Sequence, residues 1–98
     1  MARLFAVWNT RGAAWNDARP MEEQADWKGH AAFMNALQAE GFVVIGGPLE
    51  GTRDALLIIR ADNAEEIHAR LAEDPWRRTG LLTTPRVLPW TLRLGSLD

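Results

Sequence analysis

The chain of 98 residues suffices for one domain, expected over residues 1–98, and its hydrophobic fraction of 47% excludes a disordered protein. The formal net charge of −2 argues against nucleic acid as the main partner, because phosphate binding requires a basic face. The absence of cysteine excludes disulfides and thiolate chemistry, and no apolar run reaches the roughly 18 residues of a membrane span, so we expect a cytoplasmic protein without a membrane partner.

The first half of the sequence has the pattern of a strand, a loop and a helix. A compact apolar run predicts a strand over residues 3–9, and residues 11–19 contain Gly, Asn and Asp without a period, which indicates a loop. Over residues 21–40, apolar side chains recur at steps of three and four and predict a helix with one buried side. Pro20 suits the first turn of that helix, and Gly41 is a typical stop signal.

The second half predicts three further strands. Apolar runs predict strands over residues 42–45 and 55–61, and the first of these is expected to end at the Gly-Gly-Pro of residues 46–48. The last extended segment, residues 81–94, contains two prolines. Because proline cannot donate a hydrogen bond to a neighbouring strand, this segment is predicted to lie at the edge of a sheet.

A second helix is expected between the third and fourth strands. Asp62 stands three residues before Glu65, which is the spacing of a capping box. Ile67 and Leu71 are expected to face the core. The helix is predicted to end at Asp74-Pro75, because proline cannot continue it without losing a hydrogen bond.

This order of elements, β-α-β-β-α-β, predicts an α+β fold of the ferredoxin-like type, with a four-stranded antiparallel sheet and two helices on one face. Three of the strands are apolar at nearly every position, whereas a strand with one wet face alternates apolar and polar side chains. Two helices cover only one side of the sheet, so the other side requires a cover that this chain does not supply. A second copy packed sheet to sheet is the simplest cover, and we expect a homodimer.

His30 is the residue that most suggests chemistry. It lies on the buried side of the predicted first helix, together with Trp27, Phe33 and Met34. An imidazole changes charge near neutral pH, which suits a general acid or base. The alternative is a histidine at the edge of the core, whose ring nitrogens bond backbone groups or nearby acids.

Two acids are candidate partners of His30. Asp26 lies four residues earlier on the same helical face, a spacing that allows side-chain contact. Asp74, in Asp74-Pro75-Trp76, would reach across the sheet and orient the ring, as carboxylates do in hydrolytic triads. The alternative for Asp74 is a cap or turn residue at a helix end. The sequence leaves the choice between the two acids open, and the lack of a serine nucleophile motif argues against acyl transfer.

Other residues are candidates for the walls of a substrate pocket. The two glycines of Gly46-Gly47-Pro48 would allow a ligand to approach the backbone closely, and a plain turn is the alternative. Trp8, Trp27 and Trp76 would suit an apolar pocket for a flat ring, and the alternative places them in the core or at an interface.

No metal and no cofactor is expected. His30 and His68 lie on different predicted helices, and without cysteine a metal site would depend on acids. The sequence lacks the glycine-rich motifs that bind dinucleotides or nucleotide phosphates. Arg77 and Arg78 are expected to lie in a solvated loop rather than to hold an anionic group.

Several strings, in their order and spacing, resemble the YciI-like (YCII-related) family. The resemblance covers about residues 3–94. The matching strings are Trp27-x-x-His30-x-x-Phe33-x-x-x-Leu37, Gly41-Phe42, Gly46-Gly47-Pro48-Leu49, the apolar run 55–59, Leu71-Ala72-x-Asp74-Pro75-Trp76, Gly80 and Val87-x-Pro89-Trp90.

The resemblance implies a dimeric α/β-barrel, similar in architecture to muconolactone isomerase, with His30 and Asp74 at the positions of the family's active-site histidine and aspartate. One branch of the family is a dehydrochlorinase that acts on a chlorinated hydroxyquinol, by a proton-transfer elimination without a cofactor. Some members place Arg-Pro immediately before the histidine, whereas Arg19-Pro20 lies far upstream here. This departure leaves the substrate open.

The sequence therefore predicts a cofactor-independent small-molecule enzyme of the lyase or isomerase type. His30, held by Asp74, would transfer a proton on a small cyclic or aromatic substrate. The alternatives are a non-catalytic metabolite-binding or regulatory dimer with the same pocket, a dimerising scaffold and, ranked lower, a cofactor-free oxygenase.

Overall fold

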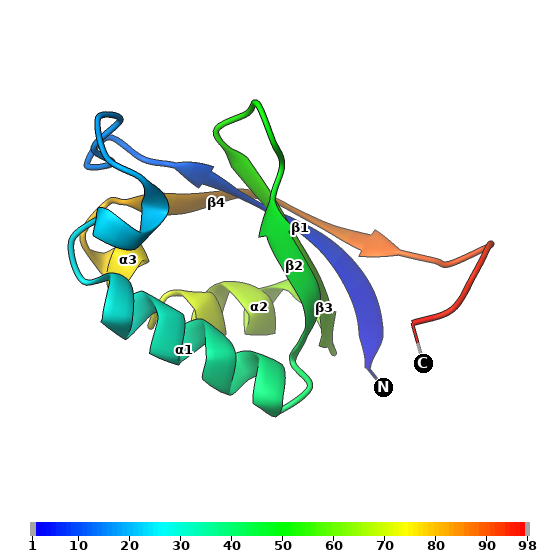
Figure 1. The fold of residues 1–98 in the computed structure, drawn as a ribbon. Coiled ribbons are helices and arrows are strands. Elements are labelled where there is room, and N and C mark those ends of the chain that lie inside the picture. The colour runs from blue at the N-terminus through cyan, green and yellow to red at the C-terminus, as the bar shows by residue number, and fades with distance from the viewer. Residues whose placement is uncertain (1, 98) are drawn as a thin grey trace.

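The structure is a computed structural model that describes residues 2–97 (Figure 1). The predicted order of strands and helices is present, with two short helical turns in addition. The elements are β1 (Arg3–Arg11), the 3-10 turn η1 (Met21–Glu23), α1 (Trp27–Ala39), β2 (Val43–Pro48), β3 (Asp54–Ala61), α2 (Ala64–Leu71), α3 (Pro75–Arg78) and β4 (Leu82–Trp90). None of the helices in this described part is long and apolar enough to cross a membrane.

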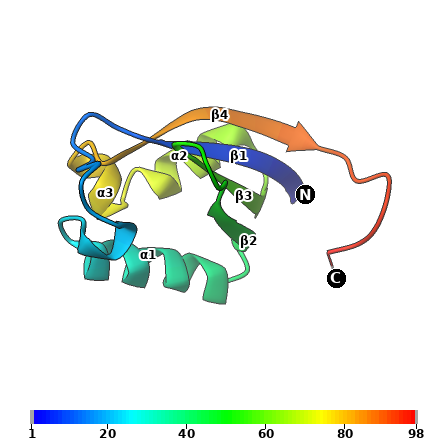
Figure 2. The same cartoon turned by 45° about the horizontal axis from the view of Figure 1, so that its top comes forward.

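The four strands form one antiparallel sheet in the order β2-β3-β1-β4. Figures 1 and 2 show α1, α2 and α3 together on one side of this sheet. This arrangement confirms the predicted ferredoxin-like α+β fold. It also confirms that the proline-containing strand β4 lies at an edge. An edge strand has a neighbour on one side only, so the backbone N–H that proline lacks need not leave a hydrogen bond of the sheet unmade.

The first helix begins later than predicted. The sequence pattern starts at residue 21, but the regular helix begins at Trp27, after Asp26 has taken a left-handed backbone conformation with φ of 57°. The Asp26 carboxylate caps the helix by accepting a hydrogen bond from the Gly29 amide at 3.2 Å. A Cβ at position 29 would overlap that carboxylate, so a larger residue there would require the Asp26 side chain to move. The predicted stop at Gly41 is confirmed, because this residue has a φ of 83°.

Four predicted boundaries in the second half also differ from the structure. Residues 46–48 continue β2 rather than end it, and Gly46 packs so closely that a Cβ would overlap the Leu57 side chain. The cap of α2 is Asn63, which accepts from the Glu66 amide at 2.8 Å, one residue later than the expected Asp62 and Glu65. α2 ends at Leu71, Pro75 starts α3, and β4 ends at residue 90 instead of 94.

The core lies between the sheet and the helices. β1 and β3 direct alternate side chains inward, and the predicted core residues Ile67 and Leu71 of α2 are fully buried against them. A second, smaller cluster lies at the other end of the sheet, where Trp15, Trp76, Leu81 and Leu82 pack together. His30 packs against this aromatic cluster through Trp76.

The opposite face of the sheet has no covering layer in the described chain (Figure 2). Ile45, Leu88 and Trp90 are exposed there by 54%, 42% and 43%. These side chains share that face because they lie in register with outward-facing residues of β1 and β3. The homodimer that the apolar strands suggest stays a prediction.

Candidate active site

His30 and Asp74 are in direct contact, although 44 residues separate them in the sequence. His30 lies in the first turn of α1, on the side that faces the sheet, and Asp74 is the residue that caps α3. Nδ1 of His30 lies 2.9 Å and 3.0 Å from the two carboxylate oxygens. The Asp74 side chain has no exposed surface, while that of His30 keeps 11%. Of the two candidate acids, Asp74 is therefore the partner of the ring.

This contact determines the tautomer of neutral His30. A carboxylate oxygen only accepts, so Nδ1 carries the hydrogen and Nε2 of the neutral ring carries the lone pair. Within residues 2–97 no hydrogen bond reaches Nε2, and no buried polar side-chain atom lacks a partner. Nε2 is therefore accessible from outside the protein interior. A neutral His30 can accept a proton at this atom, and a protonated one can donate it.

Aromatic packing determines the orientation of the His30 ring. The ring stacks on Trp76 with a centroid distance of 3.8 Å and an interplanar angle of 4°. Trp76 itself is held by a 2.7 Å hydrogen bond from its Nε1 to the Ala25 carbonyl and by edge contact with Trp15. Trp27 packs against both Trp76 and His30. One edge of the imidazole thus faces Asp74 and one face is covered by Trp76.

Arg77 anchors the carboxylate of Asp74. Nη1 of Arg77 donates to Asp74 Oδ2 at 2.6 Å, and the Trp76 amide donates to Oδ1 at 3.0 Å. The prediction that Arg77 lies in a solvated loop is wrong, since its side chain is only 9% exposed; its neighbour Arg78, at 63%, is the solvated one. Burial lowers the pKa of the Arg77 guanidinium, and the Asp74 charge opposes that effect. The pair is thus a buried ion pair held in place by the start of α3.

The network continues from Arg77 to the sheet. Its Nε donates to Thr84 Oγ1 at 2.9 Å, and its Nη2 donates to Asn9 Oδ1. The Thr84 hydroxyl also donates to Asn9 Oδ1 at 2.9 Å. Side chains from β1, β4, α1 and α3 thereby form one connected polar group, which restricts the position of the His30 ring.

A cavity of about 210 Å³ adjoins this group. The side chains along its wall are largely apolar, and two arginines and one aspartate lie among them. The described residues that line it are Asn9, Arg11, Trp15, Met21, His30, Met34, Gly46, Gly47, Pro48, Arg53, Asp54, Ala55, Leu57, Trp76 and Leu82. The predicted wall residues Gly46, Gly47, Pro48 and Trp76 are all present, and His30 forms part of the same wall.

Two predicted wall residues lie elsewhere. Trp8 points to the other face of the sheet, where Arg86 lies over its ring at 5.1 Å, because strand neighbours alternate and Asn9 takes the inward position. Trp27 contacts His30 and Trp76 without being among the lining residues. The expectation that Trp8 and Trp27 form the pocket wall is therefore corrected.

Three residues of the site, Asn9, Arg77 and Thr84, were not predicted as site residues from the sequence. Asn9 follows Phe5 and Val7 at steps of two, and this alternation could have identified it as a buried polar residue. Arg77 and Thr84 carry no comparable signal, since their role depends on how β4 and α3 meet. Within residues 2–97, no group of three or more His, Asp or Glu side chains is arranged to hold a metal ion.

The family model of the YCII-related domain matches residues 4–91. The chain belongs to the YCII-related family. No curated protein sequence matches this YCII-related chain significantly. Among solved structures, it is similar to 5-chloro-2-hydroxyhydroquinone dehydrochlorinase from Burkholderia phenoliruptrix in complex with 2,5-dihydroxybenzoquinone, at 22% identity and a TM-score of 0.60. The match covers 94% of this chain and 95% of the other, and at this identity it establishes the shared fold.

Proposed function

We propose that this YCII-related protein is a cofactor-independent enzyme that transfers a proton on a small cyclic or aromatic substrate, with His30 as the acid–base group. The observation that carries the proposal is the contact between His30 Nδ1 and Asp74, which leaves Nε2 accessible in the wall of a mostly apolar cavity. A general acid or base needs this combination of a fixed ring, a defined tautomer and an open nitrogen.

The proposed step uses only groups of this chain. Neutral His30 takes a proton from a C–H or O–H bond of the substrate at Nε2, and the electron pair of that bond stays on the substrate as a conjugated anion. In an isomerisation, the imidazolium returns the proton to a different atom. In an elimination, the electron pair expels a leaving group such as chloride. Either reaction type balances without an oxidant or a reductant.

Asp74 is proposed to act through His30 as a positioning residue. Its carboxylate orients Nδ1–H and stabilises the imidazolium that forms during proton transfer. Arg77 and the Trp76 amide hold the carboxylate in place, so it needs little rearrangement when the ring becomes charged.

The class of substrate is proposed from the cavity. A volume of about 210 Å³ and a largely apolar lining suit a molecule of one ring. The dehydrochlorinase of the same fold binds a one-ring quinone, which supports a substrate of this kind for the present chain. We further propose that two copies pair through the sheet face that carries Ile45, Leu88 and Trp90.

Turnover by matched variants tests this proposal. Chlorinated hydroxyquinols, followed by chloride release, and unsaturated lactones, followed by absorbance, are the substrates. We expect His30→Gln to lower kcat/KM by about 10²–10⁴-fold. His68→Gln is the control, because His68 is exposed on α2, and it should retain wild-type turnover.

Asp74→Asn separates a positioning role from a structural one. The amide keeps an oxygen for the Trp76 amide and stabilises a protonated His30 less than a carboxylate does. The kcat per folded molecule, with the folded fraction taken from circular dichroism, should therefore fall by about tenfold or more, a change that loss of folded protein alone does not produce. Equal turnover by wild type and His30→Gln would remove His30 from the mechanism. Binding that depends on His30, without any chemistry, would instead identify a metabolite-binding module.

A further inference from the structure

The amide of Asn9 has an orientation that its neighbours determine. Asn9 is 3% exposed, and its Oδ1 accepts hydrogen bonds from Arg77 Nη2 and from the Thr84 hydroxyl. A guanidinium only donates, so the amide oxygen must face Arg77 and the amide nitrogen must face away from it. The assignment of oxygen and nitrogen thus follows from the chemistry of the partner.

The Asn9 amide nitrogen faces the cavity. In the described part of the chain no acceptor bonds to Nδ2, and no buried polar side-chain atom lacks a partner. Nδ2 is therefore accessible, and Asn9 lines the cavity that adjoins His30. Two N–H donors thus remain free for a ligand in that cavity.

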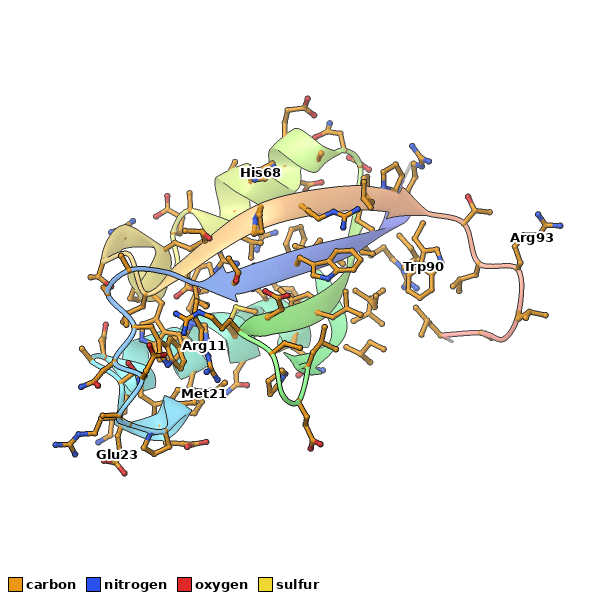
Figure 3. The ribbon with its side chains drawn as sticks, turned by 90° about the horizontal axis from the view of Figure 1, so that it is seen from above. Arg11, Met21, Glu23, His68, Trp90 and Arg93 are labelled. Atoms are coloured by element: carbon orange, nitrogen blue, oxygen red, sulfur yellow. The ribbon has the colours of Figure 1, made fainter. Side chains whose placement is uncertain are left out.

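Arg11 adds a positive charge to the same wall. It lies two residues after Asn9 on the same side of β1, and its guanidinium lies 4.5 Å from the ring centroid of Trp15. Within residues 2–97 no carboxylate lies within ion-pair distance of Arg11. The other cationic lining residue, Arg53, is already paired with Asp17 at 2.8 Å. In Figure 3 Arg11 and Met21, which both line the cavity, lie toward the same side of the molecule, away from Trp90.

From these two residues we infer that the β1 wall of the cavity binds an ionised oxygen of the substrate, through the Asn9 amide N–H groups and the Arg11 guanidinium. The catalytic role of this anion site rests on the proposed function, whereas the binding of an anion there does not. When His30 removes a proton from a conjugated ring, negative charge moves onto a ring oxygen or remains on a carboxylate substituent. Donors already aimed at that oxygen stabilise the charge without rearrangement. The substrate class is thereby narrowed to small rings that carry a phenolate, enolate or carboxylate oxygen.

Asp54 does not place a negative charge against Asn9 and Arg11. It is the one acidic residue among the described lining residues, and it is the first residue of β3. Asp54 pairs with Thr10 of β1, so its side chain leaves β3 on the opposite face of the sheet from Asn9 and Arg11. The positions of Asn9, Arg11 and His30 in the cavity wall predict that the acidic proton of the substrate faces His30 and its charged oxygen faces β1.

Binding of a matched pair of ligands tests the inference separately from turnover. The probes are 4-hydroxybenzoate and 4-hydroxybenzamide, which share ring and size and differ in charge. Titration calorimetry gives both dissociation constants, and the fluorescence of Trp15 and Trp76 in the cavity wall provides a second measurement. We expect wild type to prefer the benzoate by about tenfold or more, as charge-assisted hydrogen bonds allow.

Two variants should remove this preference. Asn9→Asp keeps an oxygen for Arg77 and Thr84 but replaces the donating NH2 group with an acceptor, and Arg11→Gln removes the charge at the cavity mouth. Each should weaken benzoate binding by about tenfold and leave benzamide binding within about twofold. Arg19→Gln is the control, because it removes a positive charge from an exposed pair with Glu23 and should change neither constant.

The possible outcomes separate the two proposals. The inference is overturned when wild type binds both probes equally, when it binds neither at millimolar concentration, or when Asn9→Asp and Arg11→Gln both keep the preference. Arg11→Gln decides the question alone when circular dichroism shows that Asn9→Asp has not folded. His30→Gln should retain the benzoate preference. If this variant also turns substrate over like wild type, the proposed function is contradicted, but the anion site is not.

Discussion

Replacing Arg77 should destabilise the protein far more than replacing its neighbour Arg78. Arg77→Met preserves most of the side-chain volume but leaves the Asp74 carboxylate, which has no exposed surface, without its cationic partner. It also removes the donors to Thr84 and Asn9. Breaking a buried ion pair by removing one member costs about 3–5 kcal/mol, because the remaining charge is uncompensated. We expect a loss of unfolding free energy in that range.

Arg78→Met provides a matched comparison. Arg78 and its partner Glu73 are 63% and 66% exposed, and exposed ion pairs contribute only about 0–1 kcal/mol. Urea unfolding of wild type and both variants at one protein concentration gives the three free energies, with circular dichroism as the signal. In thermal unfolding, each kcal/mol should correspond to a Tm change of about 4–8 °C for a domain of this size. Equal losses for the two variants would refute the view that Arg77 is part of a buried, charge-balanced network.

The remaining predictions concern the sheet. Gly46→Ala should lose about 1–3 kcal/mol of stability, because its Cβ would overlap the buried Leu57 side chain, whereas Gly47→Ala has open space around the added atom and should change stability by less than about 0.5 kcal/mol. Urea unfolding of the pair checks this, and a reversed order would contradict the close approach at Gly46. Leu88→Glu on the outer sheet face should convert a homodimer to monomers in light scattering, while Gln38→Glu on α1 should not. A wild-type chain that is monomeric at high micromolar concentration would contradict the proposed sheet-to-sheet pairing.

The element order was predictable because apolar runs and breakers are local signals. The strands at residues 3–9 and 55–61 and the stop at Gly41 are present close to their predicted places. The start of α1 was not predictable in this way. Gln24, which the helical pattern includes, is buried and instead binds the loop, where it accepts from the Asn16 amide and donates to the Asn16 and Arg19 carbonyls. Hydrogen bonds from this side chain to the backbone of the preceding loop override the local helix propensity.

The sequence by itself determined the strand and helix order, the apolar core, and His30 as a candidate with Asp26 and Asp74 as its two possible partners. Their types and spacing carried that information, because an imidazole on a buried helical face requires a polar neighbour. Only the tertiary structure decided that Asp74 rather than Asp26 is the partner, that Trp8 turns away from the cavity, and that Arg77 and Asn9 complete the polar group. Those choices depend on how α3 and β4 pack against β1, and distances between segments far apart in the chain are not encoded in any local pattern.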